Sequence, residues 1–185
     1  CNMSKVTIAG DVNGTGVFTI AAPNGNTNRT LTLPDEAGTV ALQGGAGVGK
    51  VLQVVQGTTA TVTTTTSQSF QSTGLTAAIT PSSTSSKILI IATSTLVGTT
   101  LTDVLTTIYR GNTSTGVNVS GGNLSAKYNA QASENSSVTN QYLDSPSTTS
   151  SQTYTFAFRS SASGQTVTAQ SGGVIGVIIL MEIAA

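Results

Sequence analysis

Short, strand-sized runs of Val, Ile, Leu and Thr follow one another along most of this chain, and Gly, Ser, Asn and Pro separate them. β-Branched side chains pack well on the pleated, half-buried surface of a sheet, whereas the separating residues favour turns. Many short strands at regular spacing are typical of a sandwich or a jelly roll. The pattern therefore predicts an all-β fold with almost no helix.

Two regions are expected on either side of a glycine-rich stretch. Residues 1–43 alternate short strands with Asn-Gly and Pro turns, which predicts a small β-meander arm that needs a partner surface for its order. We expect this arm to be an attachment segment that makes contact through Leu31, Leu33 and Val40. Residues 44–50 predict a flexible linker, and residues 51–185 predict a jelly-roll-like β-sandwich.

Twelve strands are predicted in the second region. They cover residues 51–56, 60–65, 69–72, 75–80, 87–95, 101–110, 117–120, 123–130, 137–143, 153–160, 166–170 and 174–183. Two segments, 88–91 and 174–180, are apolar at consecutive positions and so on both faces of a strand. One face can bury against the opposite sheet, which leaves the other for a neighbouring subunit.

The second of these segments supplies the predicted subunit interface. We expect it to line the axis of a homotrimer, with contacts made by Val174, Ile175, Val177, Ile178, Ile179 and Leu180. Substitution of Gly176 by Asp is then expected to place a charge in the contact and dissociate the assembly.

The composition argues against nucleic acid as a partner and against a membrane span. Thr and Ser make up 57 of the 185 residues, whereas seven basic and seven acidic residues give a net charge of zero. No basic stripe is present to displace counterions from a phosphate backbone. The longest apolar run, residues 174–181, is too short to cross a bilayer as a helix, which needs about 20 residues.

No enzymatic motif is found. The chain has no His, and its single Cys, Cys1, provides no metal cluster. The sequence from Gly44 to Lys50 matches the G-x-x-x-x-G-K frame of a phosphate-binding loop, but the next residue is Val51 where a magnesium-binding Ser or Thr is needed. The seven carboxylates show no supporting spacing, and Asp103 and Arg110 are expected on opposite faces of one strand. We therefore predict no catalytic residue, no cofactor and no metal.

Several short motifs resemble those of one group of proteins. They are V-T-I-x-G-D-x-x-G over residues 6–14, T-L-T-L-P over 30–34, G-T-V over 38–40 and a terminal I-L-M-E-I over 179–183. In this order they resemble small structural and fibre proteins of tailed bacteriophages. The resemblance implies a place on the surface of the virion, a trimer and contacts with other virion proteins. A receptor on the host surface is a further candidate partner.

Three functions remain open from the sequence. The leading hypothesis is a trimeric fibre or appendage module that acts by assembly. A capsid decoration protein, which staples capsomers together, is the nearest alternative. The third is a bacterial surface lipoprotein anchored through Cys1.

Overall fold

In the computed structural model of the chain, residues 13–15, 25, 50–99, 102–129 and 134–184 are described. The chain divides into two units, Cys1–Ala41 and Leu42–Ala185, and every described strand belongs to the second unit. The predicted attachment residues Leu31, Leu33 and Val40 lie outside the described residues, as does all of the predicted linker except Lys50. The limits of the arm and of the linker stay predictions.

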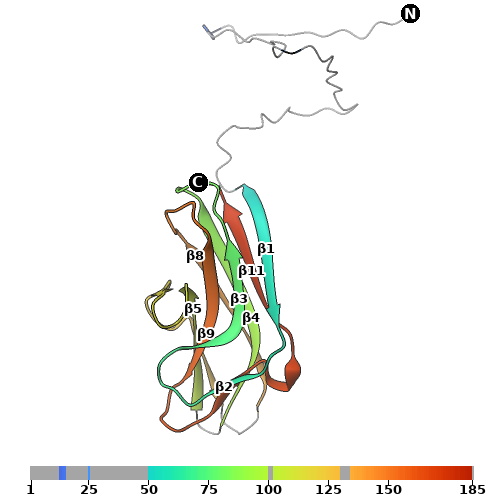
Figure 1. Cartoon of the computed structure of the whole chain (residues 1–185), viewed down its shortest axis with the longest axis vertical. Coiled ribbons are helices and arrows are strands. Elements are labelled where there is room, and N and C mark those ends of the chain that lie inside the picture. Colours follow the sequence, from blue (N-terminus) through green and yellow to red (C-terminus); the bar gives the residue numbers. More distant parts are fainter. Residues whose placement is uncertain (1–12, 16–24, 26–49, 100–101, 130–133, 185) are drawn as a thin grey trace, which may run out of the picture. The chain divides into compact units, whose positions relative to one another are not determined.

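The second unit is a sandwich of two antiparallel sheets (Figure 1). The first sheet has the order β1-β11-β4-β10-β2, and β8 pairs with β4. Its strands are β1 (Val51–Thr59), β2 (Thr63–Thr65), β4 (Lys87–Gly98), β8 (Ser136–Asp144), β10 (Val167–Ala169) and β11 (Gly176–Ile183). The second sheet has the order β3-β9-β5-β6, and β7 also pairs with β5. Its strands are β3 (Gln71–Ile79), β5 (Thr102–Arg110), β6 (Val117–Asn118), β7 (Ser125–Asn129) and β9 (Gln152–Ser160).

The pairs of strands form a nested set. β1 pairs with β11, β2 with β10, β3 with β9, β4 with β8, and β5 with both β6 and β7. A long hairpin whose two arms pair in this way is the element from which a jelly roll is built, and the predicted jelly-roll-like arrangement stays a prediction. The predicted all-β sandwich is confirmed, since η1 (Ser171–Gly173), a single 3-10 turn, is the one helical element among the described residues.

Most of the predicted strands occur with their ends moved by a few residues. The segments predicted at 69–72 and 75–80 join into β3, because Gly74 adopts a φ of 80° and lets the strand continue through a register shift. The segment predicted at 174–183 begins at Gly176, after the turn η1. No helix in the described ranges has the length and apolarity required to cross a membrane.

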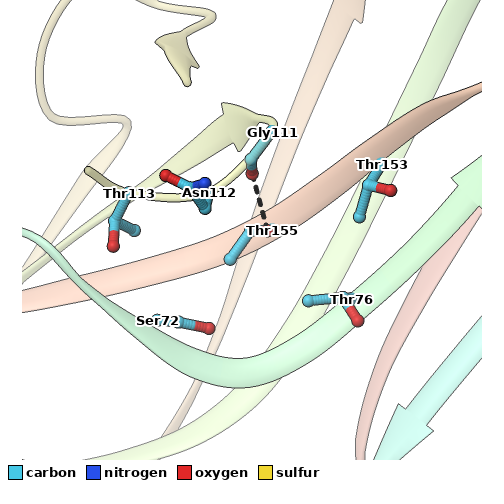
Figure 2. Close-up of a pocket in the computed structure, with 7 residues that line it drawn as sticks. All are labelled: Ser72, Thr76, Gly111, Asn112, Thr113, Thr153 and Thr155. Atoms are coloured by element: carbon cyan, nitrogen blue, oxygen red, sulfur yellow. Dashed lines mark hydrogen bonds between the residues drawn. The ribbon is translucent and has the colours of Figure 1, made fainter. Parts of the chain in front are cut away.

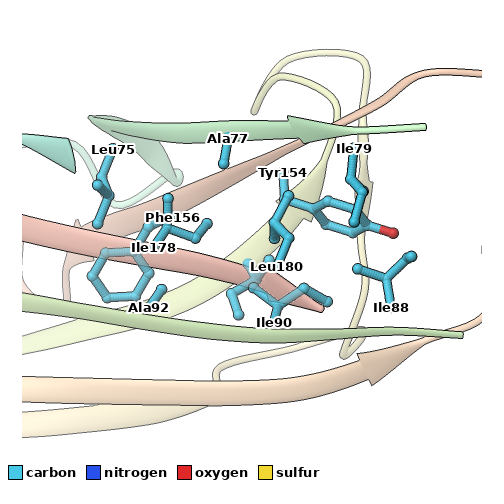
Figure 3. Packing of buried hydrophobic residues seen from close by; sticks show 11 residues of the cluster. Leu75, Ala77, Ile79, Ile88, Ile90, Ala92, Tyr154, Phe156, Ile178 and Leu180 are labelled. Carbon is cyan, nitrogen blue, oxygen red and sulfur yellow. The ribbon is translucent and has the colours of Figure 1, made fainter. Parts of the chain in front are cut away.

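Apolar side chains from both sheets fill the space between them (Figure 3). The main cluster consists of Leu75, Ala77 and Ile79 of β3, Ile88, Ile90 and Ala92 of β4, Ile108 of β5, Tyr154 and Phe156 of β9, and Ile178 and Leu180 of β11. A second cluster contains Leu96, Val104, Phe158, Val167 and Ala169. Full burial of one Leu or Ile side chain contributes about 2 kcal/mol, so these clusters supply most of the stability of the sandwich.

One edge of the sandwich is unusually tight. Gly57 of β1 faces inward, and a Cβ atom at this position would overlap the main-chain carbonyl of Thr76 on β3. Glycine is therefore the residue that lets the edge strands of the two sheets approach each other here.

Candidate functional site

The inner residues of β11 are part of the core of the protomer. Burial alternates along the strand, and Ile178 and Leu180 are fully buried against the second sheet. Gly176 is also buried, and a Cβ added to it would lie 3.0 Å from the Gln170 side chain and 3.4 Å from Leu75. An Asp at residue 176 would thus place its charge inside the protomer, and the expectation that it reports on a subunit contact is wrong.

The other predicted interface residues are accessible. Val177 and Ile179 are on the opposite face of β11 and are partly exposed. Val174 and Ile175 lie before the strand and are exposed by 50% and 63%. The interface itself stays a prediction, but these four residues are the part of it that a second chain could reach.

We call the surface of the first sheet that faces away from the second sheet the outer face. One apolar row crosses four of its strands in register: Val54 of β1 pairs with Met181 of β11, Met181 with Leu89 of β4, and Leu89 with Leu143 of β8. Val54 is 58% exposed and Leu143 is 48% exposed. The outer face therefore presents a continuous apolar band to its surroundings.

The positions beside this row are apolar or uncharged. The next row contains Gln56, Ile179, Ile91 and Gln141, and the row after it contains Thr58, Val177, Thr93 and Thr139. The hydroxyls of Thr93 and Thr139 are 2.8 Å apart and form a hydrogen bond. Among the outward-facing positions of β1, β4, β8 and β11, only Lys87 is charged, and it lies opposite Ile183 at one end.

A buried carboxylate links the two sheets. The hydroxyl of Tyr154 donates a hydrogen bond of 2.6 Å to Asp144, and Arg110 forms an ion pair of 3.1 Å with the same oxygen. Burial raises the pKa of Tyr154 far above its ordinary value, and the hydrogen bond to Asp144 acts in the same direction. No pattern in the sequence indicates this contact, because β5, β8 and β9 meet only through the fold.

A second buried carboxylate belongs to Glu182 of β11. It accepts hydrogen bonds from the main-chain nitrogen of Ser82 at 2.7 Å, from the Ser82 hydroxyl at 2.6 Å and from the Gln53 amide at 2.6 Å. Burial alone would raise the pKa of Glu182, but these hydrogen bonds and one from Ser86 outweigh it and lower the pKa to about 2. Both carboxylates thus stabilise the fold through satisfied hydrogen bonds.

The described ranges show no group of three or more His, Cys, Asp or Glu side chains that could hold a metal ion. The sequence motif Gly44 to Lys50 lies outside them except for Lys50, which directly precedes the strand β1. A strand at this point differs from the helix that a phosphate-binding loop requires.

A pocket of about 490 Å³ opens on the second sheet (Figure 2). Its lining comes from β3, from β9 and from the turn that follows β5, and consists of Ser72, Thr76, Gly111, Asn112, Thr113, Thr153 and Thr155. None of these residues carries a charge. Sequence reasoning missed this pocket, because Thr and Ser are so common in the chain that those of the pocket do not stand out.

Comparison with known proteins gives a weak structural similarity alone. The chain matches no protein-family model and no curated protein. Among solved structures, a chain from the structure of infectious bursal disease virus Gx strain is similar, with a TM-score of 0.36 and 13% sequence identity. The similarity covers 72% of this chain and 37% of the viral chain, so this chain spans well under half of that protein's length. At this TM-score the similarity has no bearing on function.

Proposed function

We propose that the chain is a non-enzymatic structural protein of a tailed-phage virion, a trimeric fibre or appendage module that acts by assembly. The outer face, with its apolar row and its lack of charge, carries this proposal. Contiguous apolar surface that is exposed on a folded chain marks an interaction site. The partner we propose is further copies of the same chain, because an almost uncharged face lacks the groups that would attract an oppositely charged partner.

The size of the outer face sets the expected strength of association. Four strands spaced by about 4.8 Å, with some eight residues each at about 3.3 Å, give roughly 500 Å² of flat surface. A standard stable interface uses about 800 Å² from each partner. The outer face alone is therefore at the small end of the range, and we expect association in the micromolar range of concentration.

The sequence supports the non-enzymatic part of the proposal. The absence of His and the single Cys remove the commonest nucleophile and base pairs. The place on a phage particle rests on the resemblance of the terminal motifs and on the durable all-β architecture.

Sedimentation of the full chain between 1 and about 100 µM tests the assembly, because this range brackets a micromolar dissociation constant. We expect the wild type to form trimers, and Met181→Glu, which places a charge in the middle of the apolar row, to remain monomeric. Ala126→Glu puts the same charge on an exposed strand position of the second sheet and serves as the control. A wild type that stays monomeric throughout would refute the proposal, and a Met181→Glu variant that associates normally would exclude the outer face as the contact.

Imaging of labelled particles tests the location. A label on the tail supports the fibre or appendage module. A label spread over the capsid would favour the decoration protein instead. Particles without any label would contradict the proposal that the chain is a virion protein.

A further inference from the structure

We propose that the pocket on the second sheet is a binding site for a neutral saccharide. It lies on the sheet opposite to the one that carries the outer face, and the proposal does not rest on assembly. Its volume of about 490 Å³ is within the range of small-molecule sites, which is about 300 to 1,000 Å³.

The absence of charge in the lining selects against ionic ligands. An anion or cation that entered this pocket would lose part of its hydration without meeting an opposite charge, which is unfavourable. Asp144 and Arg110, the nearest ionised pair in sequence to the turn after β5, are engaged with each other. The ligand is therefore expected to be neutral.

The side chains of the lining also select against a purely apolar ligand. Five of the seven residues carry a hydroxyl, and a sixth, Asn112, carries an amide. Each of the four threonines offers a methyl group beside its hydroxyl, and Figure 2 shows these side chains arranged around an open space. A sugar ring has the matching pattern, because its C–H groups alternate with hydroxyls that donate and accept hydrogen bonds.

Several of these polar groups have no partner within the described part of the chain. The hydroxyls of Thr76, Thr113 and Thr153 and the amide nitrogen of Asn112 make no hydrogen bond to a described residue. They can exchange bound water for the hydroxyls of a ligand at little cost.

The turn that forms one wall is held rigidly on β9. The nitrogen of Gly111 donates to the Thr153 carbonyl at 2.7 Å, and the Thr155 hydroxyl donates to the Gly111 carbonyl at 2.8 Å. Gly111 adopts a φ of 92°, which favours glycine, and Gly116 has no room for a Cβ atom. A wall fixed in this way loses little entropy when a ligand binds.

The orientation of Asn112 is fixed as well. Its Oδ1 accepts hydrogen bonds from the nitrogen of Ser114 at 2.9 Å and from the nitrogen and hydroxyl of Thr115 at 2.8 and 3.1 Å. The amide nitrogen is consequently the free end of the side chain. It provides a neutral donor at a defined position, which suits an ether or hydroxyl oxygen of a sugar.

The test uses methyl glycosides of glucose, galactose and mannose, added up to tens of millimolar to the full chain. Binding is followed by chemical-shift changes in amide-resolved NMR spectra. We expect at least one of the glycosides to shift the signals of Gly111 and the Asn112 side-chain amide. Glucuronate and glucosamine, which are charged sugars, are expected to bind at least tenfold more weakly.

Two variants assign the binding to the pocket. Asn112→Asp keeps the oxygen that accepts from Ser114 and Thr115 but removes the free donor, and Thr153→Val removes one hydroxyl at nearly constant shape. We expect each to weaken binding about tenfold or more, with an unchanged melting temperature. Thr58→Val, the same substitution on the outer face, is the matched control and should bind as the wild type does.

The outcomes separate this proposal from the assembly proposal. Absence of any shift with the neutral glycosides, tighter binding of a charged sugar, or unchanged binding in both pocket variants would each overturn the saccharide site. The monomeric Met181→Glu variant is expected to bind like the wild type, so a failure of assembly leaves the saccharide result intact.

Discussion

Tyr154 and Asp144 form a hydrogen bond of 2.6 Å between the two sheets, in a site where the tyrosine is fully buried. Arg110 of the second sheet neutralises the carboxylate from the side of β5. The three side chains thus cross-link the sandwich through polar contacts in addition to its apolar core.

Tyr154→Phe removes one donor from this carboxylate. Because a hydrogen bond to a charged group contributes about 1.5 to 3 kcal/mol, we expect a loss of unfolding free energy of this size. Chemical denaturation measures it. Tyr142→Phe is the control, since the Tyr142 hydroxyl makes no hydrogen bond to a described residue, and its effect should be near zero. Equal effects of the two substitutions would contradict the role of the Asp144 contact.

The same tyrosine predicts a loss of stability at alkaline pH. The pKa of Tyr154 is higher in the folded chain than its usual value of 10.0, chiefly because of burial. The folded state therefore holds the proton more tightly, and this contribution is complete below pH 10 and declines as the pH rises above it. We expect the wild type to lose more stability than Tyr154→Phe between pH 10 and 12, as measured by thermal unfolding.

Glu182 predicts the opposite behaviour in acid. Its pKa falls from a usual value of 4.5 to about 2 in the folded chain, so its contribution is complete above pH 4.5 and is lost as the pH falls toward 2. Glu182→Gln should be less stable than the wild type at pH 7 and should show a flatter pH profile between 4.5 and 2. Glu134→Gln removes an exposed carboxylate that interacts with Lys127 rather than with Ser82 or Gln53, and it should keep the wild-type pH profile between 4.5 and 2. If Glu182→Gln kept the wild-type dependence of stability on pH, Glu182 would not be the group responsible for the loss of stability in acid.

Gly57→Ala tests the close approach of β1 to β3. A methyl group at residue 57 forces the Thr76 carbonyl away, and overpacking of this kind costs about 1 to 3 kcal/mol. Gly122→Ala is the matched control, because a Cβ there meets nothing within 4 Å, and its effect should stay within about 0.5 kcal/mol. Denaturant midpoints for both variants provide the measurement. If Gly57→Ala left the free energy of unfolding unchanged, β1 and β3 would lie farther apart than the structure shows.

Ile178 and Ile179 separate folding from association. Ile178 is fully buried, so Ile178→Ala should cost about 2 to 5 kcal/mol of protomer stability. Ile179 points to the outer face, so Ile179→Ala should weaken trimer formation and change the stability of the monomer much less. Sedimentation and denaturation of both variants give the comparison. If Ile178→Ala rather than Ile179→Ala weakened association selectively, the assignment of faces would be wrong.

Strand positions could be predicted because their signals are local. Segment 88–91 and β11 show the reason. Their apolar residues are consecutive rather than alternating with polar ones, which predicted strands covered on both faces. The structure buries the residues on the inner face of each strand. The prediction did not separate Ile178 from Ile179, because an apolar residue on either face of the strand gives the same pattern. The face is fixed by the register with β4.

Contacts between distant residues could not be predicted in this way. Arg110 and Asp144 are 34 positions apart on strands of different sheets, and no spacing rule joins them. Glycine is an unfavourable strand residue, so the sequence gives no reason for Gly57. The structure gives one, because a Cβ atom there would overlap the Thr76 carbonyl. The pocket on the second sheet depends on the turn at Gly111, whose φ of 92° no pattern in the surrounding residues specified.

The nested order of the strands has a consequence for biosynthesis. β1 pairs with β11, and all other strands of the sandwich lie between these two in the chain. The ribosome releases β1 long before β11 exists, so β1 has no partner while the intervening strands are made. Pairing at such sequence separation is slow because the closure of a long loop must precede it. The sandwich is therefore expected to close only after Ile183 has left the ribosome, and its apolar inner faces stay accessible to solvent until then.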